Sequence, residues 1–146
     1  MASYSFDVTL RIWHPNFDPS VVSQNLGLTP EFTSRAGERR RTPKGTLLSG
    51  TYAESYWCSR PFFRDGEQSA SANTAEDVLA HAVDTLLPHK VFLRLIREQG
   101  GRSNLEISSF GGRNYALELS PQLMAMCAEL GLTLVHDVYA VAQSSF

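Results

Sequence analysis

The residues best suited to hold a charged ligand form one cationic cluster in the first half of the chain. The cluster contains three consecutive arginines and a nearby lysine, namely Arg39, Arg40, Arg41 and Lys44. Guanidinium and ammonium groups make charge-assisted hydrogen bonds to phosphate and carboxylate groups, so this cluster could bind a small anionic ligand or an acidic protein. Arginine runs in loops are more often only solvated, and both interpretations stay open.

Four further residues are candidates for lining a pocket beside the cationic cluster. They are Arg35, Glu38, Trp57 and Asp137. The indole of Trp57 could stack on a base or another ring, although tryptophan is more often a buried anchor of a core. Asp137 could pair with Arg11 if the strands that carry them are neighbours. Such a pair would be structural or would form a wall of the pocket.

The sequence contains no arrangement typical of catalysis or of metal binding. None of the four histidines lies at zinc-ligand spacing from another histidine or from a cysteine. No serine sits in a Gly-x-Ser-x-Gly turn, and Gly111-Gly112 precedes a predicted strand rather than the helix of a phosphate-binding loop. We therefore expect no metal, no cofactor and a protein that binds rather than catalyses.

Length, charge and cysteine content limit the class of protein. The chain has 146 residues, of which 42% are hydrophobic and 19% charged, and this suits a single domain over residues 1–146. The net charge of −2 lacks the basic excess of a nucleic-acid-binding domain, so nucleic acid is not an expected partner. No apolar run is long enough for a membrane span and the N-terminus lacks a signal pattern, which predicts a cytoplasmic protein. Cys58 and Cys127 are far apart in the sequence and are expected to be reduced.

These candidate residues need a framework, and its clearest element is a helical region over residues 73–101. Thr74 precedes Asp77 by three residues, which is typical of an N-terminal cap. Pro88 removes a backbone donor and predicts a kinked helix or two short ones. Apolar residues recur at helical spacing and predict one buried face. That face contains Val78, Leu79, Ala82, Val83, Leu86, Leu87, Val91, Phe92, Leu95 and Ile96.

Two strand–helix units of similar sequence flank the helical region. In the first unit, residues 6–12 alternate between apolar and polar and predict a strand, and Asp18-Pro19 predicts the start of a helix. In the second unit, Ser120-Pro121 has the same role. Both helices end in the letters Leu-Gly-Leu-Thr, with glycines at Gly27 and Gly131. This similarity predicts an internal repeat in which both glycines have a positive φ.

The remaining segments predict the rest of a sheet. Residues 52–57 predict a second strand region, residues 105–119 a β-hairpin, and residues 134–141 a central strand that is apolar on both faces. Residues 35–45 predict an exposed loop, and residues 64–73 a connector. The expected fold is α+β, with a largely antiparallel sheet of about five strands and helices on one face. The repeat would make it a pseudo-duplicated ferredoxin-like arrangement.

The order of these motifs resembles that of a known family. After the opening strand, the motifs are, in order, Asp18-Pro19, Leu26-Gly27-Leu28-Thr29-Pro30, Arg35, Gly37-Glu38, Trp57, the helical region, Leu119-Ser120-Pro121, Leu130-Gly131-Leu132, and a closing strand with Asp137 and Tyr139. Over nearly the whole chain they resemble the bacterial family catalogued as domain of unknown function 4279. The resemblance implies a bacterial protein and suggests an immunity or partner-binding role for some members, but it implies no activity.

Two classes of function follow from these observations. The leading hypothesis is a non-catalytic binding protein, such as an inhibitor or an immunity-type partner, that uses the cationic cluster. The alternative is a small enzyme or ligand sensor with a pocket between the sheet and the basic loop, lined by Arg35, Glu38, Trp57 and Asp137. Changes in the cationic cluster would weaken binding in the first class, whereas changes at Trp57 or Asp137 would remove activity in the second.

Overall fold

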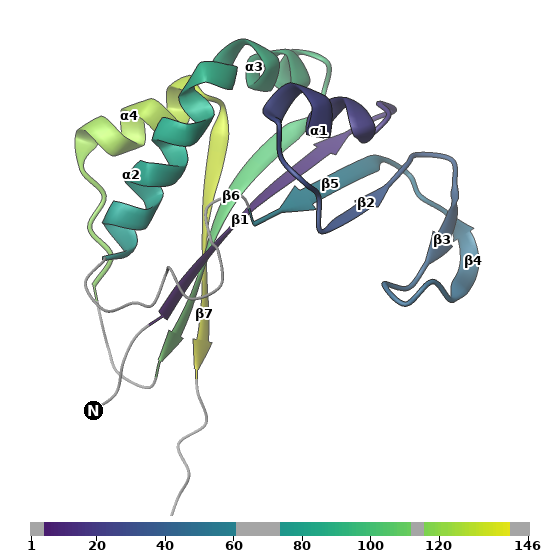
Figure 1. Ribbon diagram of the computed structural model, residues 1–146, viewed down its shortest axis with the longest axis horizontal. Helices are drawn as coiled ribbons and strands as arrows, with labels where there is room; N and C mark the ends of the chain where they lie inside the picture. Colours follow the sequence, from purple (N-terminus) through teal and green to yellow (C-terminus); the bar gives the residue numbers. More distant parts are fainter. Residues whose placement is uncertain (1–4, 61–73, 112–115, 141–146) are drawn as a thin grey trace, which may run out of the picture.

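The computed structural model describes residues 5–60, 74–111 and 116–140. Five strands form the main sheet, and they are β1 (Ser5–His14), β2 (Phe32–Ser34), β5 (Ser55–Ser59), β6 (Arg102–Gly111) and β7 (Leu132–Ala140). Their order is β2-β5-β1-β6-β7, with β6 and β7 parallel and the other neighbours antiparallel. The helices cover one face of this sheet (Figure 1). This arrangement confirms the expected α+β fold and its largely antiparallel sheet.

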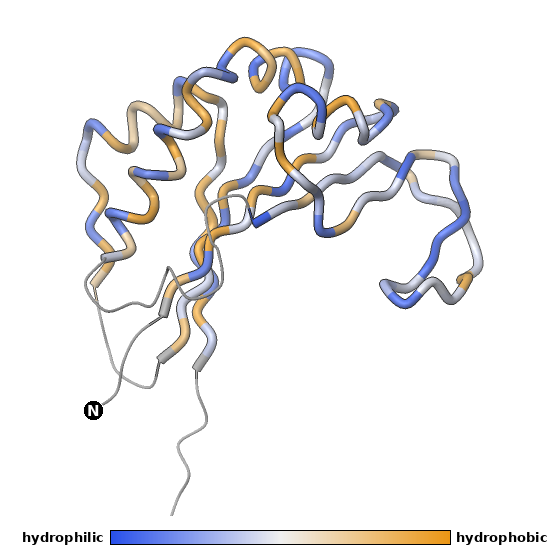
Figure 2. The backbone as a smooth tube through the Cα atoms, in the orientation of Figure 1, coloured by the Kyte–Doolittle hydropathy of each residue, from blue (hydrophilic) through white to orange (hydrophobic). Residues whose placement is uncertain are grey.

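Strand β1 lies between β5 and β6 and shows why the two faces of the sheet differ. Val8, Leu10 and Ile12 are fully buried against the helices. Successive side chains of a strand point to opposite faces, so Arg11 and Trp13 lie on the face without helices. The core therefore lies between the sheet and the helical layer, and Figure 2 shows hydrophobic residues along both the helices and the strands. We refer to the other side as the open face.

The predicted helical region consists of two helices, as the proline indicates. Helix α2 (Ala75–Leu86) is followed by the short 3₁₀ turn η1 (Leu87–His89) and by helix α3 (Lys90–Glu98). The hydroxyl of Thr74 accepts a hydrogen bond from the Asp77 N–H, and the Asp77 carboxylate accepts one from the Thr74 N–H. This reciprocal cap confirms the predicted helix start. Asn73, the first residue of the predicted region, lies outside the described residues.

The buried face of the helical region is predicted correctly on α2 but only in part on α3. Leu79 and Leu86 of α2 are fully buried, as are Leu93 and Ile96 of α3 to within 2%. Leu95, however, is 44% exposed, and Val91 is 83% exposed. Leu95 follows the buried Leu93 by two residues of the same helix, a rotation of about 200°, and therefore points away from the core. The prediction that Leu95 is buried is wrong.

Helices α1 (Ser20–Leu26) and α4 (Pro121–Glu129) begin and end much as the sequence predicts. The Ser120 hydroxyl accepts a hydrogen bond from the Leu123 N–H and caps α4. The Asp18 carboxylate accepts one from the Ser20 N–H, although Pro19, one residue later, is the position that caps α1. Both helices end at glycines of left-handed conformation, Gly27 with φ 67° and Gly131 with φ 70°. These positive φ values confirm the prediction for the two stops.

The strands that follow these two helices are placed differently in the sheet. Strand β7, after α4, lies directly beside β6. Strand β2, after α1, is separated from β1 by β5. Two equivalent halves would have placed these strands alike. The pseudo-duplicated ferredoxin-like arrangement is therefore not confirmed and stays a prediction.

Two predicted strands near the C-terminal end need correction. Residues 116–120 are irregular rather than the second arm of a hairpin, because β1 and β7 occupy both sides of β6 and leave no place for that arm. Strand β7 is an edge strand and not the predicted central strand. Its Val138 is 56% exposed, since no strand of the described chain lies beyond it. Residues 112–115 and 141 lie outside the described residues, as does the whole of the predicted connector over residues 64–73.

The predicted basic loop is a small β-hairpin that projects from the main sheet (Figure 1). Strand β3 (Arg39–Arg41) pairs antiparallel with β4 (Leu47–Thr51). Within the predicted exposed loop over residues 35–45, Arg39 and Arg40 of β3 are exposed and Arg41 is partly buried. The hairpin is nevertheless ordered by backbone pairing, a feature that the charged sequence does not reveal.

Among the helices of the described residues, none is long and apolar enough to cross a membrane.

Candidate functional site

Aromatic side chains from three strands form a row across the open face. Trp13 of β1 lies opposite Tyr56 of β5, and their ring centroids are 5.3 Å apart. Phe32 of β2 continues the row, with its ring centroid 6.2 Å from that of Tyr56. Directly opposed residues of an antiparallel pair bring their side chains together on one face, which explains the contact of Trp13 with Tyr56. The helices cover the other face, so these rings are not part of the core.

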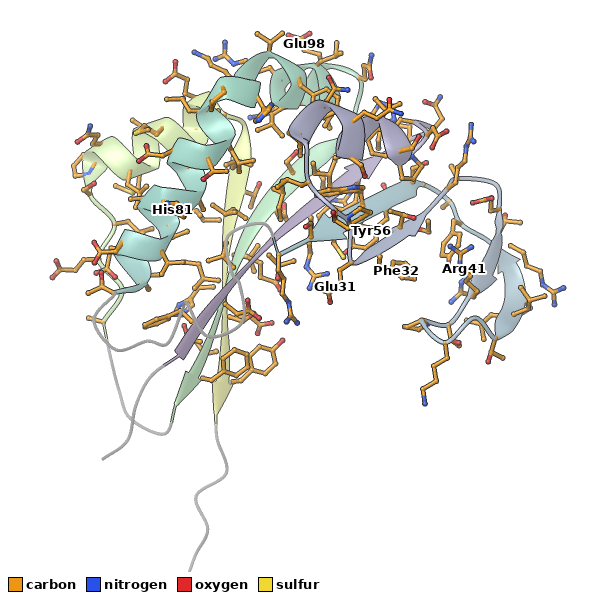
Figure 3. All side chains as sticks on the ribbon, viewed as in Figure 1. Glu31, Phe32, Arg41, Tyr56, His81 and Glu98 are labelled. Carbon is orange, nitrogen blue, oxygen red and sulfur yellow. The ribbon has the colours of Figure 1, made fainter. Side chains whose placement is uncertain are left out.

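A hollow of about 420 Å³ opens beside this aromatic row. Trp13, Phe32 and Tyr56 line it from the sheet, and residues 52–54, which follow the hairpin, line it from the other side. Figure 3 shows Tyr56 and Phe32 on the sheet and Arg41 on the hairpin next to them. We call this site the aromatic hollow, and the described residues that line it are Trp13, Phe32, Ser34, Tyr52, Ala53, Glu54 and Tyr56.

Hydrogen bonds hold the hairpin against the sheet and so fix the wall of the hollow. The Arg41 guanidinium donates to the carbonyl of Thr33 in β2 at 3.2 Å. The Tyr52 hydroxyl donates to the Arg41 carbonyl and accepts from the Arg41 N–H, each at 3.1 Å. Within the hairpin, the Arg39 guanidinium donates to the Leu48 carbonyl at 3.0 Å. Two of the three consecutive arginines therefore have a structural role.

The floor of the hollow is supported by a charged network on the open face. Arg11 makes an ion pair with Glu106 at 3.0 Å and also donates to the Tyr56 hydroxyl. Burial raises the pKa of Tyr56, an effect that Cys58 strengthens and Arg11 opposes. Burial by itself would lower the pKa of Arg11, but the bonds to Glu106 and Tyr56 outweigh it and the pKa lies above its ordinary value. Tyr56 is thus a neutral, fixed ring at neutral pH.

The opposite end of the row carries a second charged pair. The Arg102 guanidinium lies over the Trp13 ring, 4.3 Å from its centroid. The same guanidinium faces both carboxylate oxygens of Glu54, at 3.4 and 3.5 Å. Glu54 thereby connects the wall of the aromatic hollow to the β6 side of the sheet. The Arg102 guanidinium thus lies against one end of the aromatic row.

The predicted site residues do not gather in one place. Arg35 and Glu38 line a separate hollow of about 320 Å³ at the start of α1, where Arg35 pairs with Asp18 at 3.6 Å. Arg40 and Lys44 are exposed on the hairpin. No side-chain hydrogen bond or ion pair joins either of them to another residue that the structure describes. They are the two members of the cationic cluster that are available to a partner.

The structure places Trp57 and Asp137 outside both hollows. Trp57 is fully buried, and its indole N–H donates to the Ser23 hydroxyl at 2.9 Å, so it belongs to the core as the stronger of its two interpretations predicts. Asp137 accepts a hydrogen bond from the Tyr139 hydroxyl at 2.9 Å. The predicted pair of Asp137 with Arg11 is wrong, because β6 lies between β1 and β7. Neither residue lines the hollow at the start of α1 or the aromatic hollow.

The residues of the aromatic hollow were not predicted as a site. One signal in the sequence could have indicated it. Trp13 occupies a polar position in the alternating pattern of the first strand, where the neighbouring positions of the same face are Thr9 and Arg11. A large aromatic residue on the exposed side of a strand is a candidate contact residue.

A comparison with protein families places this chain in one of them. The model of the family described as Domain of unknown function (DUF4279) matches residues 3–141. This match covers nearly all of the chain and agrees with the resemblance seen in the order of the motifs. No curated protein and no solved structure matches the chain. Within the described residues, no three side chains of histidine, cysteine, aspartate or glutamate gather in a geometry that could hold a metal ion.

Proposed function

The chain belongs to the DUF4279 family, and we propose that it is a non-catalytic binding protein whose ligand occupies the aromatic hollow. One observation carries the proposal. Trp13, Phe32, Tyr52 and Tyr56 line a single hollow on the sheet face that the helices leave open. Aromatic rings that do not serve the core are suited to contact an apolar or planar group of a ligand.

Size and rigidity support this proposal. The hollow of about 420 Å³ lies within the range of small-molecule sites, roughly 300–1,000 Å³. Its floor is held by the bond from Arg11 to Tyr56, and its wall by the bonds between Tyr52 and Arg41. Side chains fixed before binding lose less conformational entropy when the ligand arrives. The hollow is therefore suited to binding in its present shape.

The charged groups around the hollow favour binding over catalysis. Arg11 is paired with Glu106 at 3.0 Å and also donates to the Tyr56 hydroxyl. A general acid or base must reach the ligand in a state that can exchange a proton. Groups that are bound to one another instead hold the rings in position. We therefore infer a ligand-binding or sensing role rather than an enzymatic one.

Trp13→Ala tests this function. Wild-type protein is expected to bind at least one member of a panel of small probes that contains indole, adenosine, phenylalaninamide and choline, measured by calorimetric titration. The variant is expected to lose about tenfold or more in affinity for that probe, since truncation of an aromatic anchor typically costs at least about 1.4 kcal/mol.

Tyr139→Ala provides the matched control for this test. Tyr139 also lies on the open face, where it stacks on Phe110, but it does not line the hollow. Its removal is expected to leave the affinity unchanged. Equal affinities of wild type and Trp13→Ala would contradict the proposal, as would the absence of binding for the whole panel.

A second candidate function is contact of the hairpin with an acidic protein, the role first expected of the cationic cluster. Arg40 and Lys44 support it, because both are exposed and neither is held by a neighbour in the described chain. Arg39 and Arg41 are less suited, since their guanidinium groups bind backbone carbonyls. An inhibitor or immunity-type partner would use the two free cations in this way.

The double variant Arg40→Ala with Lys44→Ala tests the second candidate, with polyglutamate as the acidic probe. Stability should change by no more than about 0.5 kcal/mol, because both side chains are on the surface. Binding of polyglutamate should weaken, and its dependence on salt concentration should decrease. Unchanged binding at both low and high salt would rule out the hairpin as the contact site.

A further inference from the structure

We infer that the group held in the aromatic hollow is an organic cation, of the alkylated ammonium class. This inference rests on the proposed function, because it assumes that the hollow is a binding site. It goes further by assigning a charge and a chemical class to the ligand. Three features point to this class: the charge of the residues that line the hollow, the contacts of Arg102, and the bonds that Arg11 and Arg41 make to other groups of the protein.

The lining of the hollow favours positive charge. Among the described residues that line it, Glu54 is the one with an ionised side chain, and it is negative. The others include four aromatic rings, and the faces of such rings carry a negative electrostatic potential. A cation over an aromatic face is attracted by this potential, and the attraction increases when water is excluded. The Glu54 carboxylate and the aromatic rings thus both attract a positively charged ligand.

Arg102 shows that this part of the molecule binds a cation. Its guanidinium lies 4.3 Å from the centroid of the Trp13 ring and pairs with Glu54. The side chains of Arg102 and Glu54 are 56% and 41% exposed, and their distances of 3.4 and 3.5 Å are long for hydrogen bonds. An exposed pair of this kind contributes little to stability. A ligand cation can therefore compete with Arg102 for Glu54 at low cost.

The positive side chains Arg11 and Arg41 near the hollow are bound to other groups of the protein. Arg11 is engaged by Glu106 and Tyr56. Arg41 directs its guanidinium to the Thr33 carbonyl. An anionic ring compound in the hollow would face the carboxylate of Glu54, the one ionised side chain among the described residues of the lining. Alkyl groups on the ligand improve the fit, because they lower the hydration of the cation and pack against the rings.

Choline and its uncharged isostere 3,3-dimethylbutan-1-ol test the inference directly. The two molecules have nearly the same shape, so a difference in affinity reports the charge. Calorimetric titration of the full chain is expected to show choline binding at least about tenfold more tightly. Glu54→Gln should remove most of this difference between choline and the alcohol. Glu38→Gln, which alters a carboxylate of the other hollow, should change neither affinity.

Arg102→Ala provides a sharper variant, because it predicts a gain. Removal of the competing guanidinium should raise the affinity for choline several-fold, an effect that simple loss of a structural contact would not produce. A lower affinity for choline in this variant would contradict the competition.

A short peptide with trimethyl-lysine distinguishes the source of the cation. Tighter binding of the peptide than of choline supports the cation chemistry with a protein side chain as its source, and the reverse supports it with a free small molecule.

The possible failures are distinguishable. If the alcohol, indole or adenosine binds in a Trp13-dependent manner and choline binds no more tightly than the alcohol, the cation inference is overturned while the proposed function stands. If neither choline nor any ring compound binds, both are overturned. Circular dichroism of each variant confirms that a lost affinity does not come from unfolding.

Discussion

Trp57→Ala is expected to lower the free energy of unfolding by about 3–5 kcal/mol, the range for truncation of a buried tryptophan. Trp57 is fully buried between β5 and α1, and its indole N–H donates to the Ser23 hydroxyl at 2.9 Å. Removal of the ring leaves a cavity under α1 and deprives Ser23 of this donor. Chemical denaturation without any ligand measures the loss.

The matched control is Trp13→Ala, the same chemical change on the other face of the sheet. Trp13 is only partly buried, and its neighbours are Tyr56 and Arg102 rather than core residues. We expect a loss of about 1 kcal/mol, typical of a partly exposed site. The two variants should therefore separate stability from binding. A loss at Trp57 no larger than that at Trp13 would show that Trp57 is not a core anchor.

The features that the sequence predicts best are those that depend on a few adjacent residues. The cap formed by Thr74 and Asp77, and the left-handed stops at Gly27 and Gly131, are present as expected. Each of them is decided within one turn of a helix, where side-chain oxygen atoms satisfy free N–H groups and glycine tolerates a positive φ. The alternation of β1 is similarly local. Tertiary contacts have little influence on such signals.

The order of the strands could not be obtained in the same way. Alternation indicates which side chains share a face, but it does not say which strands are neighbours. Alternation therefore allows an ion pair of Arg11 with Asp137. In the structure, β6 lies between their strands and supplies Glu106 to Arg11 instead. Strand β7 is apolar enough for a central strand, yet it lies at the edge. These features depend on pairings between distant segments.

The aromatic hollow is the clearest example of a site that no single segment contains. Trp13, Tyr56 and Phe32 come from three strands, and they meet only because the register sets Trp13 opposite Tyr56. Glu54 reaches the hollow from the segment after the hairpin. The charged sequence of the hairpin predicts that its arginines contact a ligand. The position of the hairpin, fixed by Arg41 and Tyr52, matters more for the aromatic hollow.

A pair of leucine variants tests the helical phase on either side of Pro88. Leu86→Ala is expected to cost about 2–5 kcal/mol, because Leu86 of α2 is fully buried and its truncation leaves a cavity. Leu95→Ala makes the same chemical change in α3, at a side chain that is 44% exposed. We expect it to cost less than about 1 kcal/mol, since little apolar area is lost and little cavity is formed.

The difference between these two variants distinguishes two descriptions of the helical region. A face that continues in the phase first expected would bury both leucines and give similar losses. The observed face passes through Leu86, Leu93 and Ile96, so Leu93→Ala should resemble Leu86→Ala and not Leu95→Ala. Denaturant titration of the three variants, with equal slopes, provides the comparison. A loss at Leu95 larger than that at Leu93 would mean that α3 turns its other side to the sheet, because the two leucines lie about 200° apart around the helix.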